Sequence, residues 1–199
     1  MRKMVAIEGG WCSGKTTLLN VIDSYTVLPT VVPQIYDLIG RESNVGPDKD
    51  PETFSELFFL LRSRELEKIS RIDGPPILCD RTLFAPIALR RFNNICVPDH
   101  YYTAIERMRN DGILHSTVFF AEQIPFNKLA KGWPKRRFLY DQAARYSKIT
   151  EELIESMRFQ IKKISFGSLS ERKKTFEDLL EQEDFSENIL LPDKNSVKL

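Results

Sequence analysis

A glycine-rich stretch near the N-terminus carries the clearest chemical signal in this sequence. Residues 9–16 read GGWCSGKT and match the pattern G-x-x-x-x-G-K-[ST]. Glycines let backbone N–H groups turn toward phosphate oxygens, and a helix beginning near Lys15 adds the positive end of its dipole. Lys15 is expected to reach the β- and γ-phosphates of ATP, and the Thr16 hydroxyl to ligate Mg²⁺. The predicted ATP-binding residues are Gly9, Gly10, Trp11, Cys12, Ser13, Gly14, Lys15, Thr16 and Thr17.

Asp80 and Arg81 form a second candidate phosphate element, because they end a short apolar run that reads ILCD. An aspartate at the end of a strand can hold Mg²⁺ through water. The neighbouring arginine can bind an acceptor phosphate or the moving phosphoryl group with its forked donors. The alternative is an exposed ion pair, but the phosphate loop favours the functional interpretation, in which Asp80 and Arg81 are catalytic.

A basic run, 128–137, contains five cations and no acid. One interpretation is a lid at about 126–140 that closes over ATP, excludes water and brings Arg136 and Arg137 onto the transition state. The other is a solvated charged surface. Both interpretations stay open, and the position between an expected strand and an expected helix favours the lid.

Strands and helices are expected to alternate along residues 1–182, which predicts one α/β domain with a parallel sheet covered on both faces. The expected strands are residues 4–8, 29–33, 77–80, 117–120 and 161–166. The expected helices are residues 15–24, 52–72, 81–92, 101–110, a segment ending near 157, and 170–181, the last capped by Ser170. Active sites in such folds lie at the carboxyl ends of the strands. Residues 183–199 read as a polar, flexible tail.

The charge balance, the apolar runs and the cysteines of the chain argue against several classes of partner and site. The 29 basic and 28 acidic residues balance, so bulk charge points to neither a nucleic-acid nor a membrane partner. No apolar run approaches the roughly 20 residues of a membrane helix. The three cysteines lack C-x-x-C spacing, which argues against a zinc site or a disulfide framework. A cytoplasmic location is expected, and a homodimer is one option for the assembly.

Several motifs together resemble the thymidylate kinases and the related deoxynucleoside kinases. The motifs are IEG at 7–9, Asp80-Arg81, the basic run, FFLLRSR at 58–64 and FAEQIP at 120–125. The resemblance spans nearly the whole chain. It implies a three-layer P-loop kinase fold with a five-stranded parallel sheet in the order 2-3-1-4-5, and ATP and acceptor on opposite sides of a cleft.

The resemblance also implies an activity, the transfer of the γ-phosphoryl group of MgATP to a nucleoside monophosphate. Lys15 would then serve the donor, Asp80 the metal or the acceptor, and Arg81 the acceptor phosphate. Arg64 matches the position whose arginine contacts the acceptor base. Phe59 and Tyr36 are candidates for the base pocket, although aromatic residues at helical spacing are more often core.

Departures from the family pattern leave alternatives open. The segment 31–34 (VVPQ) lacks the acid that nucleoside kinases use as a base, and Asp37 or Glu42 would have to replace it. A nucleoside or another small hydroxyl acceptor, and a non-catalytic ATP-binding module, therefore remain alternatives. A GTP switch is disfavoured because no N/T-K-x-D motif suits the role. Trp11 replaces an acid in the loop and is interpreted as an apolar plug rather than a base-stacking surface.

Overall fold

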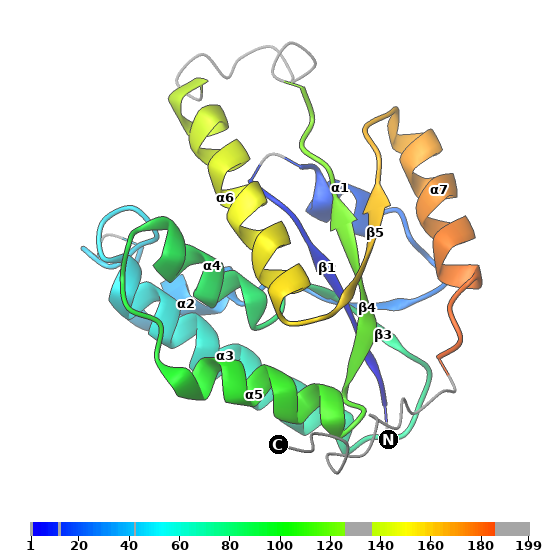
Figure 1. The fold of residues 1–199 in the computed structure, drawn as a ribbon, viewed down its shortest axis with the longest axis horizontal. Coiled ribbons are helices and arrows are strands. Elements are labelled where there is room, and N and C mark those ends of the chain that lie inside the picture. Colours follow the sequence, from blue (N-terminus) through cyan, green and yellow to red (C-terminus); the bar gives the residue numbers. More distant parts are fainter. Residues whose placement is uncertain (1, 12, 42, 126–136, 186–199) are drawn as a thin grey trace, which may run out of the picture.

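A five-stranded parallel sheet with the strand order β2-β3-β1-β4-β5 forms the centre of the molecule (Figure 1). The structure is a computed structural model that describes residues 2–11, 13–41, 43–125 and 137–185. The strands are β1 (Met4–Glu8), β2 (Thr26–Leu28), β3 (Ile77–Asp80), β4 (Leu114–Ala121) and β5 (Gln160–Ile164). The predicted fold class and strand order are confirmed.

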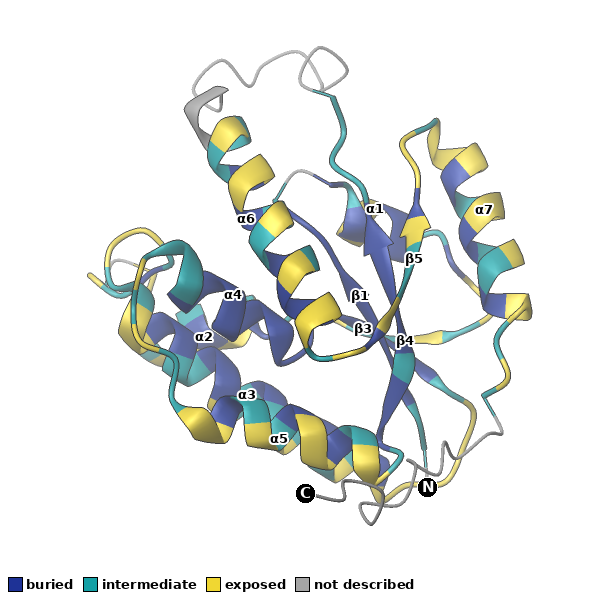
Figure 2. Cartoon of the chain, viewed as in Figure 1, coloured by how far each residue is buried: buried dark blue, intermediate teal, exposed yellow. Residues whose placement is uncertain are grey.

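Helices cover both faces of the sheet and bury two separate apolar clusters (Figure 2). Alternate residues of β1 serve the two clusters, because successive side chains of a strand point to opposite faces. Met4 and Ala6 pack beneath α2 to α6, whereas Val5 and Ile7 pack against α1 and α7. The helices are α1 (Lys15–Leu19), α2 (Val32–Ile39), α3 (Pro51–Ser70), α4 (Phe84–Phe92), α5 (Asp99–Asn110), α6 (Arg137–Ser156) and α7 (Leu169–Glu181).

The expected second strand was wrong. β2 ends at Leu28, before Pro29, and residues 32–39 form α2, which carries a proline in its first turn. Proline fits the first helical turn because that position needs no N–H donor. α7 also begins earlier than expected, because Ser168 rather than Ser170 is its N-cap and forms a capping box with Glu171.

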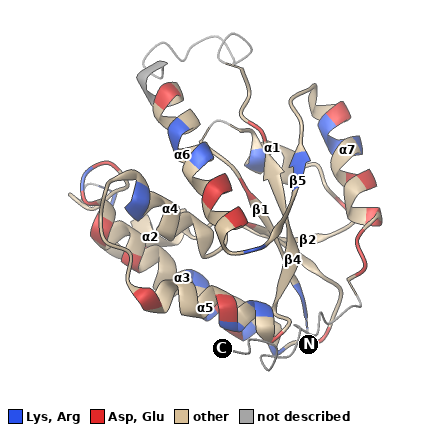
Figure 3. Cartoon of the chain, in the orientation of Figure 1, with Lys and Arg blue, Asp and Glu red and all other residues tan. Residues whose placement is uncertain are grey.

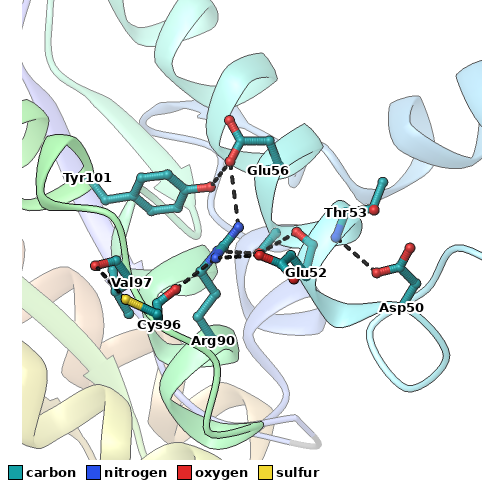
Figure 4. A network of polar contacts seen from close by, with 9 residues as sticks. Asp50, Glu52, Thr53, Glu56, Arg90, Cys96, Val97 and Tyr101 are labelled. Atoms are coloured by element: carbon teal, nitrogen blue, oxygen red, sulfur yellow. Dashed lines mark hydrogen bonds and ion pairs between the residues drawn. The ribbon is translucent and has the colours of Figure 1, made fainter.

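A buried arginine, Arg90, links α3 to α4 through a network of polar contacts (Figure 4). Arg90 is only 4% exposed; its guanidinium contacts Ser55 Oγ at 2.9 Å, Glu52 Oε1 at 3.3 Å and the Cys96 carbonyl at 2.8 Å. Tyr101 completes the network, because its hydroxyl donates to Glu56 Oε2 at 2.6 Å and its ring lies beneath Arg90. Arg90 is therefore a buried structural residue rather than a solvated one.

Part of the expected tail packs against the sheet. Glu183 pairs with Lys162 of β5 and accepts a hydrogen bond from Thr117 Oγ1 at 2.8 Å. The Phe185 ring stacks edge-on against His115 and Tyr25. Basic and acidic residues are interspersed along the helices (Figure 3). Within the described ranges, no helix combines the length and the apolar character needed to cross a bilayer.

Candidate functional site

The phosphate loop lies between β1 and α1, and two of its glycines are required by the backbone. Gly9 has φ 137°, and a Cβ there would lie 2.4 Å from the carbonyl oxygen of Ala121 on β4. Gly14 has φ 72° and is the N-cap of α1. Both conformations disfavour a side chain, so the sequence pattern reflects the geometry that brings the loop close to the sheet.

The ammonium group of Lys15 lies inside this loop. Nζ donates to the carbonyl oxygens of Gly9 at 3.0 Å and Gly10 at 2.8 Å and to Ser13 Oγ at 3.0 Å. Burial lowers the pKa of Lys15 to about 7, and repulsion from Arg81 adds to the effect. The lysine is thus a buried donor that a polyphosphate can engage in place of the loop's own oxygens.

Thr16 and Asp80 bring two hard oxygen ligands together. The Thr16 hydroxyl donates to Asp80 Oδ2 at 3.0 Å, across 64 positions of sequence. The described residues contain no group of three or more His, Cys, Asp or Glu arranged to hold a metal ion. The Thr16 and Asp80 oxygens suit Mg²⁺ because this ion commonly takes one or two protein oxygens and completes its shell with phosphates and water.

Arg81 occupies a left-handed backbone conformation at the end of β3. Its φ is 65°, and its backbone N–H donates to the Ile7 carbonyl at 3.1 Å. Nη1 donates to the Tyr146 hydroxyl at 3.3 Å, with the guanidinium 5.6 Å from the centre of the Tyr146 ring. A strained, non-glycine residue held by packing at a strand end is typical of functional sites.

Hydrogen bonds between Glu8 and Thr82 stabilise the turn at Arg81. Both residues are fully buried, and Glu8 Oε1 accepts from the Thr82 backbone N–H at 2.6 Å and its hydroxyl at 2.9 Å. Burial raises the pKa of the Glu8 carboxyl, while Arg81 and the Thr82 hydrogen bonds oppose that shift. The contact ties β1, just before the phosphate loop, to the residue after Arg81.

A cavity of about 470 Å³ opens beside the phosphate loop. Lys15, Thr16, Asp80 and Arg81 are among its polar lining residues, so the structure brings these four predicted site residues together. The rest of the lining comes from the loop, α2, α3, α4, α6 and nearby residues: Gly10, Trp11, Ser13, Gly14, Thr17, Thr30, Val32, Pro47, Phe54, Phe58, Ala85, Leu89 and Tyr146. The cavity can hold a small molecule with one apolar, planar part and one anionic part.

The structure places the other candidate acceptor residues differently. Arg64 is exposed on α3 and is not among the described residues that line the cavity. Phe59 is buried against the Tyr101 ring, 3.8 Å between centroids, and its neighbour Phe58 lines the cavity instead. Tyr36 lies beside a second hollow of about 400 Å³ and packs on Phe54.

Trp11 stacks on Tyr146, with ring centroids 4.9 Å apart and planes 12° apart, and meets Phe92 edge-on. One face of the indole is thus occupied by the protein, although Trp11 also lines the cavity. Cys12, Glu42, most of the expected lid and Arg136 lie outside the described residues, as does the side chain of Arg137.

Sequence reasoning missed three residues that the fold brings to this site. Arg62 is fully buried; its Nη2 donates to the carbonyl oxygens of Pro29 at 2.7 Å and Asp80 at 2.9 Å. Tyr146 reaches the cavity from α6, and Arg172 reaches the phosphate loop from α7. Arg62 of the sequence FFLLRSR thus contacts the backbone of Asp80 and holds the ends of β2 and β3 together.

Comparison with known proteins places this geometry in context. The chain matches the solved deoxyadenosine kinase of M. mycoides with dCMP and a flexible dCDP bound, at 17% identity and a TM-score of 0.57, covering 89% of this chain and 98% of that one. The same enzyme with dATP bound matches at 19% identity and a TM-score of 0.56, over 89% and 99% of the two chains. The thymidylate kinase of Ehrlichia chaffeensis matches at 11% identity and a TM-score of 0.60, over 90% and 98%.

These structural matches show that the fold is the one shared by thymidylate and deoxynucleoside kinases, as the sequence motifs predicted. No curated protein matches the sequence significantly. Residues 4–172, from the start of β1 to the first turn of α7, match the AAA domain family AAA_28. Because the match covers both the phosphate loop and the whole sheet, the chain belongs to this AAA domain family.

Proposed function

We propose that this protein is an ATP-dependent kinase that transfers a phosphoryl group to a nucleoside monophosphate. Lys15 stabilises the charge on the moving phosphoryl group. Thr16 and Asp80 would hold Mg²⁺, which would offset the charge of the donor phosphates when bound. Arg81 binds the acceptor phosphate, and the aromatic part of the cavity receives the base.

The observation that carries the choice of acceptor is the charge of the side chains that line the cavity. Lys15 and Arg81 are both there, and Asp80 is the one carboxylate among the described lining residues. A hydroxyl acceptor profits from a base, whereas a phosphate acceptor needs cations that hold it and reduce its repulsion from ATP. Asp37 is exposed on α2 and is not among the described lining residues.

Paired kinetics test this proposal. Each common base is offered twice to the protein with MgATP, as the nucleoside and as the 5′-monophosphate, and ADP release is measured. The monophosphate of at least one base should be the better substrate. Arg81→Ala should lower its kcat/KM by about 10²–10³, the usual effect of removing a charged transition-state donor. Arg64→Ala removes an exposed arginine outside the described cavity lining and is the matched control.

A deoxynucleoside kinase is the second candidate. The two deoxyadenosine kinase structures match this chain at 17% and 19% identity, compared with 11% for the thymidylate kinase. In that case the nucleoside is the better substrate and Arg81→Ala changes its rate little. Asp80 is then the carboxylate to test as the base, followed by Asp37 and Glu42. That outcome would contradict the monophosphate assignment while leaving phosphoryl transfer intact.

A further inference from the structure

A second cation lies against the phosphate loop, far from Lys15 in the sequence. Arg172, in the first turn of α7, is 4% exposed, and its Nη1 donates to the Ser13 carbonyl oxygen at 2.8 Å. α7 packs on the sheet face opposite α3, α4 and α6, the helices that line the cavity (Figure 1). Arg172 therefore reaches the loop from the sheet face opposite those helices.

The buried guanidinium of Arg172 has hydrogen-bond and charge partners for only part of its surface. Nε and Nη2 are inaccessible to solvent and have no hydrogen-bond partner among the described residues. Within the same residues no carboxylate comes within 4.0 Å of it, although Glu122 attracts it from further away. A cation buried in this way costs free energy that packing alone does not recover. An anion bound at the loop would offset part of that cost.

The hydrogen bond to Ser13 also fixes the direction of a donor. The peptide joining Ser13 and Gly14 is planar and trans, so its C=O and N–H point in opposite directions. While Arg172 holds the Ser13 carbonyl on the α7 side, the Gly14 N–H points away from α7. A Cβ on Gly14 would lie 2.8 Å from Arg172 Nη1 and 3.0 Å from Ile124 Cδ1, so the fit is close.

We propose that Arg172 is a positioning residue of the donor site. It holds the Ser13 carbonyl so that the Gly14 N–H points at the polyphosphate of the donor, and its buried charge adds to the attraction for that anion. The inference rests on the proposed function only in taking ATP as the donor. It adds to the site a residue 159 positions from Ser13, from the other face of the sheet.

The test is ATP binding by Arg172→Met, measured by calorimetry with Mg²⁺ and without any acceptor. The dissociation constant for ATP should rise about tenfold or more, since hydrogen bonds to charged groups are among the stronger ones. The Tm without ATP should stay the same or rise, because an apolar side chain then replaces a buried cation. Lys174→Met removes an exposed cation two residues along the same helix and should bind ATP like the wild type.

Arg172→Lys separates charge from geometry. It keeps the positive charge and should bind ATP more tightly than Arg172→Met but less tightly than the wild type. A structural role alone predicts a lower Tm with an unchanged ATP affinity, and that result overturns the inference. Failure of both the Arg172→Met and the Arg172→Lys variants to fold overturns it as well. A wild-type protein that binds ATP but phosphorylates no acceptor contradicts the proposed function, and leaves the inference standing if Arg172→Met binds ATP more weakly.

Discussion

The surroundings of the Lys15 ammonium group favour the binding of a polyphosphate at this site. Its ammonium group is buried and bonded to three oxygens of the loop that surrounds it. A structural lysine would usually be paired with a carboxylate or reach solvent. Here the partners are two backbone carbonyls and a hydroxyl, neutral groups that a phosphate oxygen can replace with a stronger, charge-assisted bond.

Lys15→Ala should abolish most turnover while the fold survives. Loss of one transition-state donor of this kind lowers kcat by about 10²–10³. ADP release under saturating substrates measures the effect, and the thermal transition checks the fold. Turnover at the wild-type rate in the folded variant would contradict the kinase assignment, and a wild-type protein without turnover would favour the non-catalytic ATP-binding module.

The oxygen pair Thr16 and Asp80 predicts a dependence on Mg²⁺. Turnover should vanish with a chelator and return with Mg²⁺, because hard oxygens suit magnesium and suit zinc poorly. Asp80→Asn should raise the Mg²⁺ concentration for half-maximal rate roughly 10- to 100-fold, as expected for a ligand that acts through water. Zinc that copurifies in a 1:1 ratio and supports full activity would contradict this prediction.

Local patterns predicted some site residues and could not predict others. The phosphate loop follows from glycine and lysine spacing, and Asp80-Arg81 from their place at a strand end. Arg172 and Glu8 act through residues 159 and 74 positions away, a relation that no local pattern contains. Phe58 and Phe59 differ by about 100° around a helix that is buried on more than one side, so periodicity does not choose between them.

At the level of elements, the sequence predicted the strand order of the sheet, but it missed α2 and misplaced the ends of several elements. The segment 29–33 is apolar and β-branched, which favours a strand, but Pro33 lies in the first turn of α2 and the actual strand is the three residues before Pro29. α4 begins at Phe84 rather than near Arg81, because the left-handed turn at Arg81 intervenes. Such turns depend on tertiary contacts like that between Glu8 and Thr82.

Arg90 links α4 to α3 through its contacts with Ser55, Glu52 and Glu56. Arg90→Ala should lower the free energy of unfolding by about 1–3 kcal/mol, because it leaves buried polar partners such as Ser55 unpaired. Urea unfolding measures the change. Arg91→Ala is the control on the same helix, since Arg91 is only half-buried and contacts Tyr102, and it should cost less than Arg90→Ala. Equal losses would show that the Arg90 network is not specific.

The whole molecule consists of two apolar layers separated by one sheet. The segment that follows α7 packs back against β4 and β5. Glu183 and Phe185, just after α7, cover His115 and Thr117 of β4. Neutral His115 is favoured here because its Nδ1 accepts from the Thr117 N–H at 3.1 Å. The sequence predicted a loose tail because these contacts join residues far apart in the chain.

The packing of Glu183 and Phe185 against His115 predicts that the free energy of unfolding depends on pH. Burial lowers the pKa of His115 below its ordinary value of 6.5, and Glu183 only partly opposes the shift. The unfolded chain then binds a proton more readily than the folded one, so stability is present above about pH 6.5 and is lost as the pH falls through the lowered pKa. Unfolding free energies between pH 7.5 and 5.5 should fall more in the wild type than in His115→Gln. Parallel curves would contradict the assignment.

The stacking of Trp11 on Tyr146 allows binding at the site to be followed by tryptophan fluorescence. The chain has two tryptophans, and Trp133→Phe would leave Trp11 as the single indole emitter. Trp11 lies in the phosphate loop, and its stacking partner Tyr146 contacts Arg81, so donor and acceptor each perturb the same chromophore from different sides. Fluorescence titration of that variant should give two additive signals, one for ATP and one for the acceptor. The order in which substrates load could then be followed in real time, without labels.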